Sequence, residues 1–312
     1  MIRYLYKLYK KTFKSWSKVV LYLGVLLTIY FIYVYLYKDT YEPFQAENNI
    51  VWLNGVNTPP ILSGNASKEK NAFCLLTRKP DDIWLQFLNT FVETYDVYVV
   101  IDDNTVDISV HSRKYPALYF IKIDNDICKG AGYWDSSYII NKEVIAWDKA
   151  LYYFGSLDKS YRHVWFSEDD VYLRSVDITK KIDGADDTSD LLCKEKTINT
   201  SGEVTSWMHW IKAKEHFDTP WSGSLQCICR MSNKMLSAID DFVKKNGRLN
   251  FIEILFTNIA DKNGMIITNP PQFRGMEYHS EHLQNIMNID LDPEIIYHAV
   301  KNTKEHEDLR NK

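Results

Sequence analysis

Short apolar runs that end abruptly in acidic residues constrain this chain more than any other feature. Three of them show the pattern: Val97–Ile101 before Asp102-Asp103-Asn104, Ala117–Ile123 before Asp124-Asn125-Asp126, and His163–Phe166 before Ser167 and Glu168-Asp169-Asp170. Helical periodicity lies between the runs, and such alternation predicts an α/β sandwich with a largely parallel central sheet. Ligands bind at the carboxyl ends of the strands in such sheets, so the acids become candidate site residues.

The same patterns predict the other main elements of this domain. We expect further strands over residues 72–77 and 225–230, and helices over residues 82–94, 142–154, 233–244 and 251–262. Val144, Trp147, Ala150, Leu151 and Phe154 form the apolar stripe of the second helix.

An uncharged stretch near the N-terminus, Val19–Tyr37, is long enough to cross a bilayer as a helix. Six Lys and Arg residues precede it, whereas Lys38 stands nearly alone after it. The positive-inside rule then predicts a cytosolic N-terminus and a lumenal remainder.

The predicted organisation has five parts. They are a cytosolic basic tail (1–18), a transmembrane anchor (19–37), an irregular stem (38–70), a catalytic domain (71–301) and a charged tail (302–312). Sequons at Asn65 and Asn199 are expected to be accessible, and all five cysteines follow the span, where the compartment permits disulfides.

Composition excludes some partners. The net charge of −4 and a pI near 6.1 leave no basic field for nucleic acid. With 46% hydrophobic residues the chain can pack a core and is not a disordered protein.

The triplet Glu168-Asp169-Asp170 is the sharpest chemical signal, because it puts hard oxygen ligands directly after a buried strand. Mg²⁺ and Mn²⁺ prefer such ligands and share them with substrate phosphates. A solvated acidic turn is the alternative.

With these features the chain resembles the GT-A-fold glycosyltransferases, particularly type II Golgi enzymes, over roughly residues 71–301. The resemblance implies a GT-A fold, a nucleotide-sugar donor and Mn²⁺ or Mg²⁺. Asp170 would be the metal ligand, Glu168 a ribose or outer contact, and Asp169 a supporting acid. Asp102 and Asp103 would lie near the donor nucleoside, unless they only form a turn. Glu168 departs from the family's aspartate-x-aspartate motif, which has Asp in its first position.

Three later residues also resemble family positions. Glu253 resembles the general base of inverting members, although Asn250 and Glu253 also fit a capping box. His298 resembles a C-terminal metal ligand, with His279 as its rival, and Lys301 would meet the diphosphate. Trp207, Trp210 and Trp221 would suit a sugar acceptor or simply the core.

The predicted activity is metal-dependent, inverting transfer of a hexosyl or N-acetylhexosaminyl group to a glycan or glycoprotein, in the Golgi or ER membrane. A non-catalytic carbohydrate-binding or scaffold protein on the same fold is the first alternative. A nucleotidyltransferase is the second, but Gly130-Ala131-Gly132 is too short for a phosphate-cradling loop.

Overall fold

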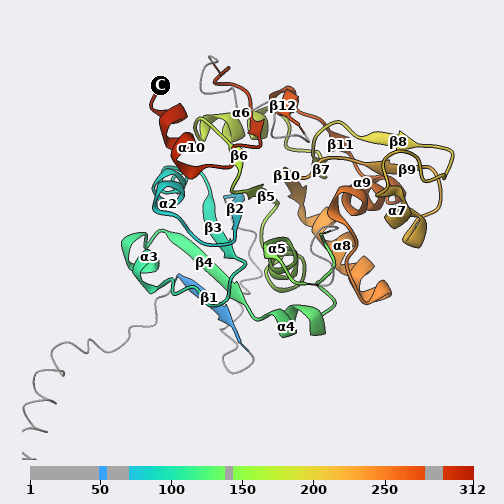
Figure 1. Ribbon diagram of the computed structural model, residues 1–312, viewed down its shortest axis with the longest axis horizontal. Coiled ribbons are helices and arrows are strands. Elements are labelled where there is room, and N and C mark those ends of the chain that lie inside the picture. The colour runs from blue at the N-terminus through green and yellow to red at the C-terminus, as the bar shows by residue number, and fades with distance from the viewer. Residues whose placement is uncertain (1–48, 55–69, 138–142, 278–290) are drawn as a thin grey trace, which may run out of the picture. The chain divides into compact units, whose positions relative to one another are not determined.

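The eight-stranded sheet at the centre of the fold appears in a computed structural model that describes residues 49–54, 70–137, 143–277 and 291–312 (Figure 1). From one edge to the other the strands are β1 (Ile50–Leu53), β4 (Leu118–Ile123), β3 (Asp96–Ile101), β2 (Ala72–Thr77), β5 (His163–Glu168), β10 (Ile228–Ser232), β7 (Leu191–Leu192) and β11 (Ile267–Thr268). The first five are parallel, β10 is antiparallel to both neighbours, and β11 pairs in parallel with β7. The predicted α/β class with a largely parallel sheet is confirmed.

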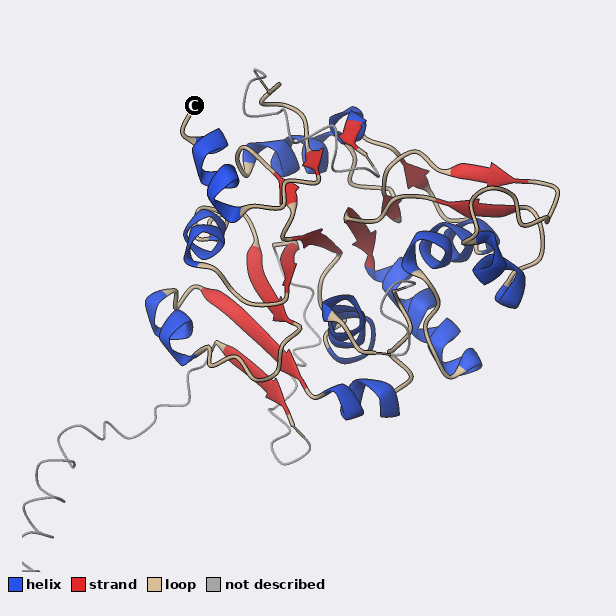
Figure 2. Ribbon diagram, viewed as in Figure 1, coloured by secondary structure: helices blue, strands red, loops and turns tan. Residues whose placement is uncertain are grey.

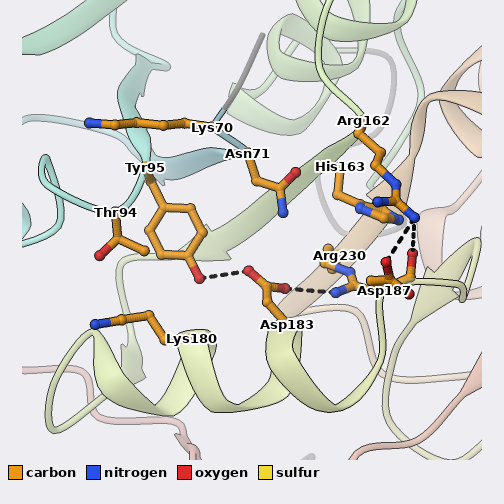
Figure 3. A pocket seen from close by; sticks show the side chains of 10 residues that line it. All are labelled: Lys70, Asn71, Thr94, Tyr95, Arg162, His163, Lys180, Asp183, Asp187 and Arg230. Atoms are coloured by element: carbon orange, nitrogen blue, oxygen red, sulfur yellow. Dashed lines mark hydrogen bonds and ion pairs between the residues drawn. The ribbon is translucent and has the colours of Figure 1, made fainter. Parts of the chain in front are cut away.

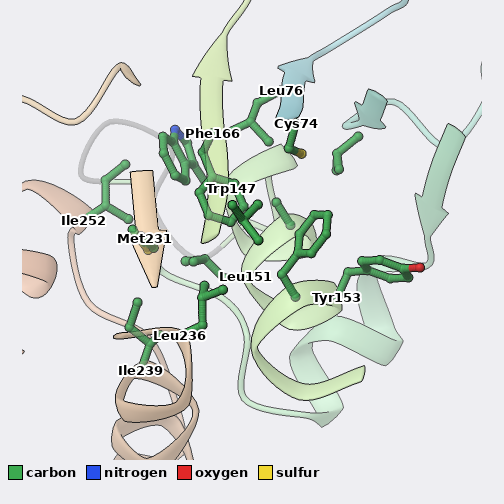
Figure 4. Close-up of a cluster of buried hydrophobic side chains, with 14 of the residues drawn as sticks. Cys74, Leu76, Trp147, Leu151, Tyr153, Phe166, Met231, Leu236, Ile239 and Ile252 are labelled. Atoms are coloured by element: carbon green, nitrogen blue, oxygen red, sulfur yellow. The ribbon is translucent and has the colours of Figure 1, made fainter. Parts of the chain in front are cut away.

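Helices cover both faces of this sheet (Figure 2). Residues of β2 alternate between two buried clusters, with Cys74 and Leu76 in one and Phe73 and Leu75 in the other. The first cluster is completed by α4 (Asn125–Gly130), α5 (Ala146–Tyr152), α8 (Asn233–Asn246) and α9 (Ile252–Lys262), and Figure 4 shows part of it. The second cluster is completed by α2 (Asp82–Leu88) and α6 (Asp177–Ala185). The remaining helices of the described residues are α3 (Ser109–Lys114), α7 (Trp210–His216), α10 (Thr303–Arg310), a π-helical turn (Tyr153–Leu157) and a 3-10 turn (Pro271–Arg274).

Helix α8 matches its predicted range closely, because local signals in the sequence mark both its start and its end. The α8 helix begins after Ser232, whose hydroxyl accepts a hydrogen bond from the Met235 N–H at 3.1 Å. It ends at Gly247, which adopts a left-handed φ of 73°. By contrast, α5 begins at Ala146 rather than residue 142, because the Asp148 carboxylate accepts the Ile145 N–H at 2.7 Å.

Strand β1 lies inside the range predicted as an irregular stem, so the stem prediction is wrong at residues 50–53. The strand pairs in parallel with β4, with Ile50 opposite Phe120. Just before it, the buried Asn49 amide donates to the carbonyls of Ser112, Tyr115 and Leu118. These partners lie more than 60 positions away, so no local pattern announces the strand.

Two small sheets flank the central one. One contains β12 (Gly275–Met276), β13 (Tyr297–His298) and β6 (Val171–Tyr172), and the other pairs β8 (Thr197–Asn199) with β9 (Trp221–Gly223). The first matters for the site, because it brings the C-terminal segment beside the residues that follow β5.

The predicted charged tail, residues 302–312, contains helix α10 (Thr303–Arg310), which packs against α2. Leu309 is buried, and the Arg310 guanidinium lies 3.5 Å from the Phe87 ring centroid. His306 is fully buried, and its Nε2 lies 2.8 Å from the Val300 carbonyl oxygen. The tail therefore holds the segment that contains His298 and Lys301.

Acid pH is expected to destabilise the fold in part through His306. Burial lowers the pKa of His306 to about 4, whereas an unfolded histidine titrates near 6.5. Between these values only the unfolded chain binds the proton, so stability present above about pH 6.5 is lost as the pH falls. For this group the loss is about 1.4 kcal/mol per pH unit.

A His306→Gln variant keeps a donor for Val300 but cannot titrate. The free energy of unfolding, measured by urea denaturation between about pH 7 and pH 5, should therefore fall less steeply in this variant. Equal slopes in the two proteins would contradict a neutral buried histidine at this position.

Some of the residues predicted to form the membrane anchor or to be modified lie outside the described part of the chain. Among the described residues no helix is long and apolar enough to cross a membrane, and the predicted anchor, 19–37, lies outside them. Asn65 and His279 lie outside them as well.

The expected accessibility of Asn199 is wrong for the folded chain. Asn199 is buried, and its side-chain amide donates to the Glu203 carbonyl at 2.8 Å. All five cysteines are buried with free thiols.

Candidate active site

The carboxyl ends of three parallel strands meet at one edge of the sheet. Strand β2 pairs with both neighbours, so that Thr77 is opposite Ile101 of β3 and Leu76 is opposite Glu168 of β5. Asp102 follows Ile101 directly, and Glu168 is the last residue of β5. The edge predicted from the sequence to bind a ligand is thus where these acids lie.

Glu168, Asp170 and His298 form a compact group of potential metal ligands. One ligand atom from each residue lies within 4.8 Å of the others. Asp170 and His298 are each only 9% exposed. The structure therefore brings together the two predicted ligands, and it adds Glu168, which the sequence suggested only as an outer contact.

Backbone pairing places His298 in this group. Strand β13 runs antiparallel to β6, with His298 opposite Val171, the residue after Asp170. The Val300 N–H donates to the Asp170 carbonyl at 2.7 Å. Residues more than 120 positions apart are thus fixed beside each other by the main chain.

The donor set fits a divalent cation. His298 Nδ1 lies 2.8 Å from the Glu277 carbonyl oxygen, so Nδ1 carries a proton and Nε2 turns toward Asp170. That contact, from His298 Nε2 to Asp170 Oδ1, is 3.6 Å, and Oδ1 is buried without a hydrogen-bond partner in the described part of the chain. A carbonyl-oriented imidazole facing two carboxylates is the arrangement that protein metal sites use.

The electrostatics of the group reflect crowded negative charge. Burial, followed by the charge of Asp170, raises the pKa of Glu168, although the Trp147 indole N–H donates to its Oε1 at 2.7 Å. Burial also acts to raise the pKa of Asp170, but His298 and Lys301 outweigh it and the net shift is downward. Lys301 forms an ion pair with Asp170 Oδ2. His298 and Lys301 thus favour the ionised form of Asp170, whereas the ionised form of Glu168 remains disfavoured.

Asp169 is directed elsewhere. Its Oδ2 accepts a hydrogen bond from the Thr77 hydroxyl at 2.6 Å, which ties the turn after β5 to the end of β2. Among the described residues Asp169 is not part of the three-residue group. We therefore assign it a role in holding the turn.

Glu253 lies in the first turn of α9 and is electrostatically linked to the same group. Burial, then the charge of Glu168, raises the pKa of Glu253 to about 8, while His298 partly offsets the rise. The alternative capping box is not formed: the helix N-cap is Phe251, with no side-chain cap bond, and the Asn250 side chain accepts from the Phe251 N–H. The carboxylate is thus free of the competing structural role.

Asp103 fits the interpretation as a turn, whereas Asp102 remains a candidate for contact with the donor nucleoside. Asp103 Oδ1 accepts from the Thr105 N–H at 2.9 Å and from its hydroxyl at 2.6 Å, which is the turn arrangement. Asp102 is half-buried, and burial raises its pKa despite the nearby Lys149. Only Asp102 therefore presents a carboxylate not already used by a turn.

Sequence reasoning missed two residues that organise the site, Trp147 and Lys149. The sequence pattern places Trp147 in the apolar stripe of a helix, but in the structure its indole N–H donates to Glu168. Lys149 is fully buried, and its Nζ donates to the Asp102 carbonyl at 2.6 Å and to Asn104 Oδ1 at 2.9 Å. The available signal was a lysine next to a strongly apolar helix stripe.

The tryptophans predicted either to stack on a sugar or to form core are mostly core. Trp210 and Trp221 are buried, with ring centroids 6.5 Å apart. Trp207 is half-buried and packs edge-on against Trp210, with centroids 4.7 Å apart. A Cβ added to Gly223 would lie 2.6 Å from the Trp207 ring, so a glycine is needed there.

Replacing His298 with alanine is expected to weaken Mn²⁺ binding by at least about tenfold, because even outer partners of metal ligands contribute that much. Isothermal titration of the full chain with Mn²⁺ measures the effect. His216→Ala is the matched control, since its side chain is 14% exposed against 11% for His298, but it lies on α7 outside the group. Equal losses in both variants, or none in His298→Ala, would remove His298 from the site.

Comparison with known proteins identifies no family for this chain. No family model and no curated protein matches it. Among solved structures, mouse xyloside xylosyltransferase 1 in its apo form is 8% identical, with a TM-score of 0.39 over 75% of this chain and 98% of that chain. The galactosyltransferase LgtC, bound to donor and acceptor sugar analogues, is 12% identical, with a TM-score of 0.41 over 77% of this chain and 95% of that chain.

A third similar structure has a different activity in its name. It is 4-diphosphocytidyl-2C-methyl-D-erythritol synthase from Anaerococcus prevotii, 12% identical, with a TM-score of 0.37 over 64% of this chain and 88% of that chain. At these identities and TM-scores the likenesses assign neither a family nor an activity to this chain.

Proposed function

We propose that this chain is a divalent-metal-dependent glycosyltransferase that uses a nucleotide-sugar donor. The observation that carries the proposal is the group Glu168, Asp170 and His298 at the carboxyl edge of the parallel sheet. Buried carboxylates beside an oriented imidazole suit a cation that is shared with substrate phosphates. The transferred group is proposed to be a hexosyl or N-acetylhexosaminyl residue, and the acceptor a glycan or glycoprotein.

Each residue of the site has a proposed role in such a transfer. Asp170, His298 and Glu168 would hold Mn²⁺ or Mg²⁺, which supplies charge neutralisation for a diphosphate leaving group. Lys301, which pairs with Asp170, would supply a second positive charge to that diphosphate. Asp102 offers a carboxylate to the hydroxyl groups of the donor nucleoside.

Glu253 is the proposed general base, which makes the reaction inverting. Its carboxylate has no hydrogen-bond partner in a helix cap, and it lies close enough to Glu168 for the two charges to interact. It would accept the proton of the acceptor hydroxyl as the new glycosidic bond forms. Neutralisation of Glu168 by a bound cation favours the ionised form that this role needs.

Turnover of a nucleotide-sugar panel by the full chain tests the proposal. Uridine, guanosine and cytidine nucleotide-sugars would be incubated in detergent with Mn²⁺, Mg²⁺ or EDTA, and released nucleotide and glycosylated acceptor quantified. Metal-dependent release from at least one donor is the expected result. Donor binding without turnover would instead favour the non-catalytic alternative, and pyrophosphate release from a nucleoside triphosphate would favour a nucleotidyltransferase.

We also propose that Val19–Tyr37 anchors the chain in the Golgi or ER membrane with its catalytic domain in the lumen. The support is the set of six basic residues before the stretch. A tag at the N-terminus should be digested by protease added to intact microsomes, while the domain after residue 48 survives until detergent is added. Protection of the tag would overturn the assigned orientation.

A further inference from the structure

A cavity of about 570 Å³ lies at the opposite edge of the central sheet from Glu168 (Figure 3). Its lining includes Asn71 just before β2, Tyr95 just before β3 and His163 at the start of β5, together with part of α6. Parallel strands begin at one edge and end at the other, so this cavity is separate from the candidate active site. Its volume is in the range of small-molecule sites.

A buried arginine lines this cavity with donors to spare. Arg230 is fully buried, and its Nη1 donates to Asp183 Oδ1 at 2.7 Å. Its Nε and Nη2 have no hydrogen-bond partner among the described residues, and Nη2 comes no nearer than 3.9 Å to Asp186. Unsatisfied buried donors on a charged group are costly, so they call for an explanation.

Asp183 cannot supply the missing acceptors, because its carboxylate is already occupied. The Tyr95 hydroxyl donates to its Oδ2 at 2.7 Å, and the Trp165 indole N–H donates to its Oδ1 at 3.1 Å. Figure 3 shows Asp183 between Tyr95 and Arg230. Asp183 and Arg230 therefore largely compensate each other, and the remaining charges decide the potential of the cavity.

Those remaining charges are predominantly positive. Lys70, Arg162 and Lys180 line the cavity against a single further acid, Asp187, which leaves a surplus of two positive charges. Arg162 and Asp187 are 3.0 Å apart, but their side chains are 61% and 63% exposed, so this ion pair is weak. It can open to let Arg162 bind another anion.

His163 adds a neutral donor between the arginines. Burial, then the charges of Arg230 and Arg162, lowers the pKa of His163 to about 4, so the imidazole is uncharged near neutral pH. The side chains of His163 and Asn71 both line the cavity (Figure 3). They offer uncharged polar contacts beside the cationic ones.

We propose that this cavity is a second binding site, for a small phosphorylated molecule whose phosphate is held near Arg162, His163 and Arg230. A phosphate monoester carries about two negative charges at neutral pH, which matches the surplus of the lining. Arginine recognises such oxyanions through paired donors, and the buried charge of Arg230 raises the potential at that end. The proposal is independent of the chemistry proposed for the Glu168 group.

Isothermal titration of the full chain with inorganic phosphate and ribose 5-phosphate tests the site. EDTA is present throughout, so that no cation at the Glu168 group can hold the probe, and ribose without its phosphate serves as the neutral control. Saturable binding of both phosphates, but not of ribose, is expected. Absence of saturable phosphate binding would overturn the proposal.

Charge reversal on α6 locates the site. Lys180→Glu is expected to weaken phosphate binding about tenfold, because it removes one attraction and adds one repulsion. Lys181→Glu makes the same change in net charge on the same helix, but Lys181 is not part of the lining and pairs with Glu294. Equal effects of the two variants would mean general electrostatics, not this cavity.

Asp187→Asn is expected to have the opposite effect on phosphate binding. Removing this negative charge raises the positive potential, although Arg162 Nη2 also donates to the Asp187 main-chain carbonyl at 3.0 Å. Phosphate binding should therefore tighten several-fold, while Asp177→Asn at the exposed start of α6 should change it little. Asp170→Asn should leave phosphate binding unchanged. Weaker binding in Asp187→Asn, or lost binding in Asp170→Asn, would place the phosphate elsewhere.

Discussion

Asp170→Asn is expected to reduce metal-dependent transfer by about 10³-fold, with the fold retained. The substitution preserves the size of the side chain but removes one of the two carboxylates that face His298. A cation at such a site contributes several kcal/mol of transition-state stabilisation, which corresponds to a rate factor of this order. The hydrogen bond from the Val300 N–H to the Asp170 main-chain carbonyl does not depend on the Asp170 side chain, so the fold should be retained.

The measurement separates metal binding from chemistry. Initial rates would be taken over a range of Mn²⁺ concentrations, so that a weaker but functional site is recognised by recovery at high metal. Asp177→Asn, on the exposed surface of α6, provides the control for a neutralised aspartate. Wild-type turnover by Asp170→Asn at limiting metal would mean that the acid triplet is a solvated turn after all.

The elements that could be predicted from the sequence are those specified by local patterns. Strand β2 coincides with its predicted range because every residue from Ala72 to Thr77 is buried and apolar or small enough to pack. Helix α8 carries its own cap and stop signals in Ser232 and Gly247. Strand β1 has no comparable signal, because its stability comes from partners far along the chain. Helix α10 has a local N-cap in Asn302, whose side chain accepts from the Lys304 N–H at 2.9 Å, but its packing against α2 is long-range.

The candidate site could likewise be predicted only where local sequence patterns specify it. Acids at strand ends are visible in the sequence, since the period of the apolar runs marks where each strand stops. The pairing of β13 with β6 cannot be predicted from the sequence, yet it places His298 beside Asp170. Trp147 and Lys149 were hidden for another reason: a helix stripe identifies buried positions but not which of them point a polar atom at the sheet edge.

Glu253→Gln is expected to lower turnover by roughly 10² to 10⁴-fold, the usual contribution of a general base. The variant keeps the shape and the hydrogen-bonding capacity of the side chain but has no carboxylate to accept a proton. Rates should be measured at saturating donor and metal, so that weaker binding cannot be mistaken for slower chemistry. Glu93→Gln, in an exposed turn, is the matched control.

The effect on stability distinguishes a base from a structural carboxylate. Burial and the charge of Glu168 raise the pKa of Glu253 to about 8, so ionising this group costs the folded state free energy. That cost grows as the pH rises from the unfolded value of about 4.3 toward 8, and glutamine does not incur it. Glu253→Gln should therefore melt close to the wild-type temperature near pH 4 and at a higher temperature near pH 8. Its loss of turnover should be largest near pH 8, where the wild-type carboxylate is most ionised. A variant that melts lower and retains more than about a tenth of wild-type turnover would make Glu253 a structural residue and would leave the inverting mechanism without its base.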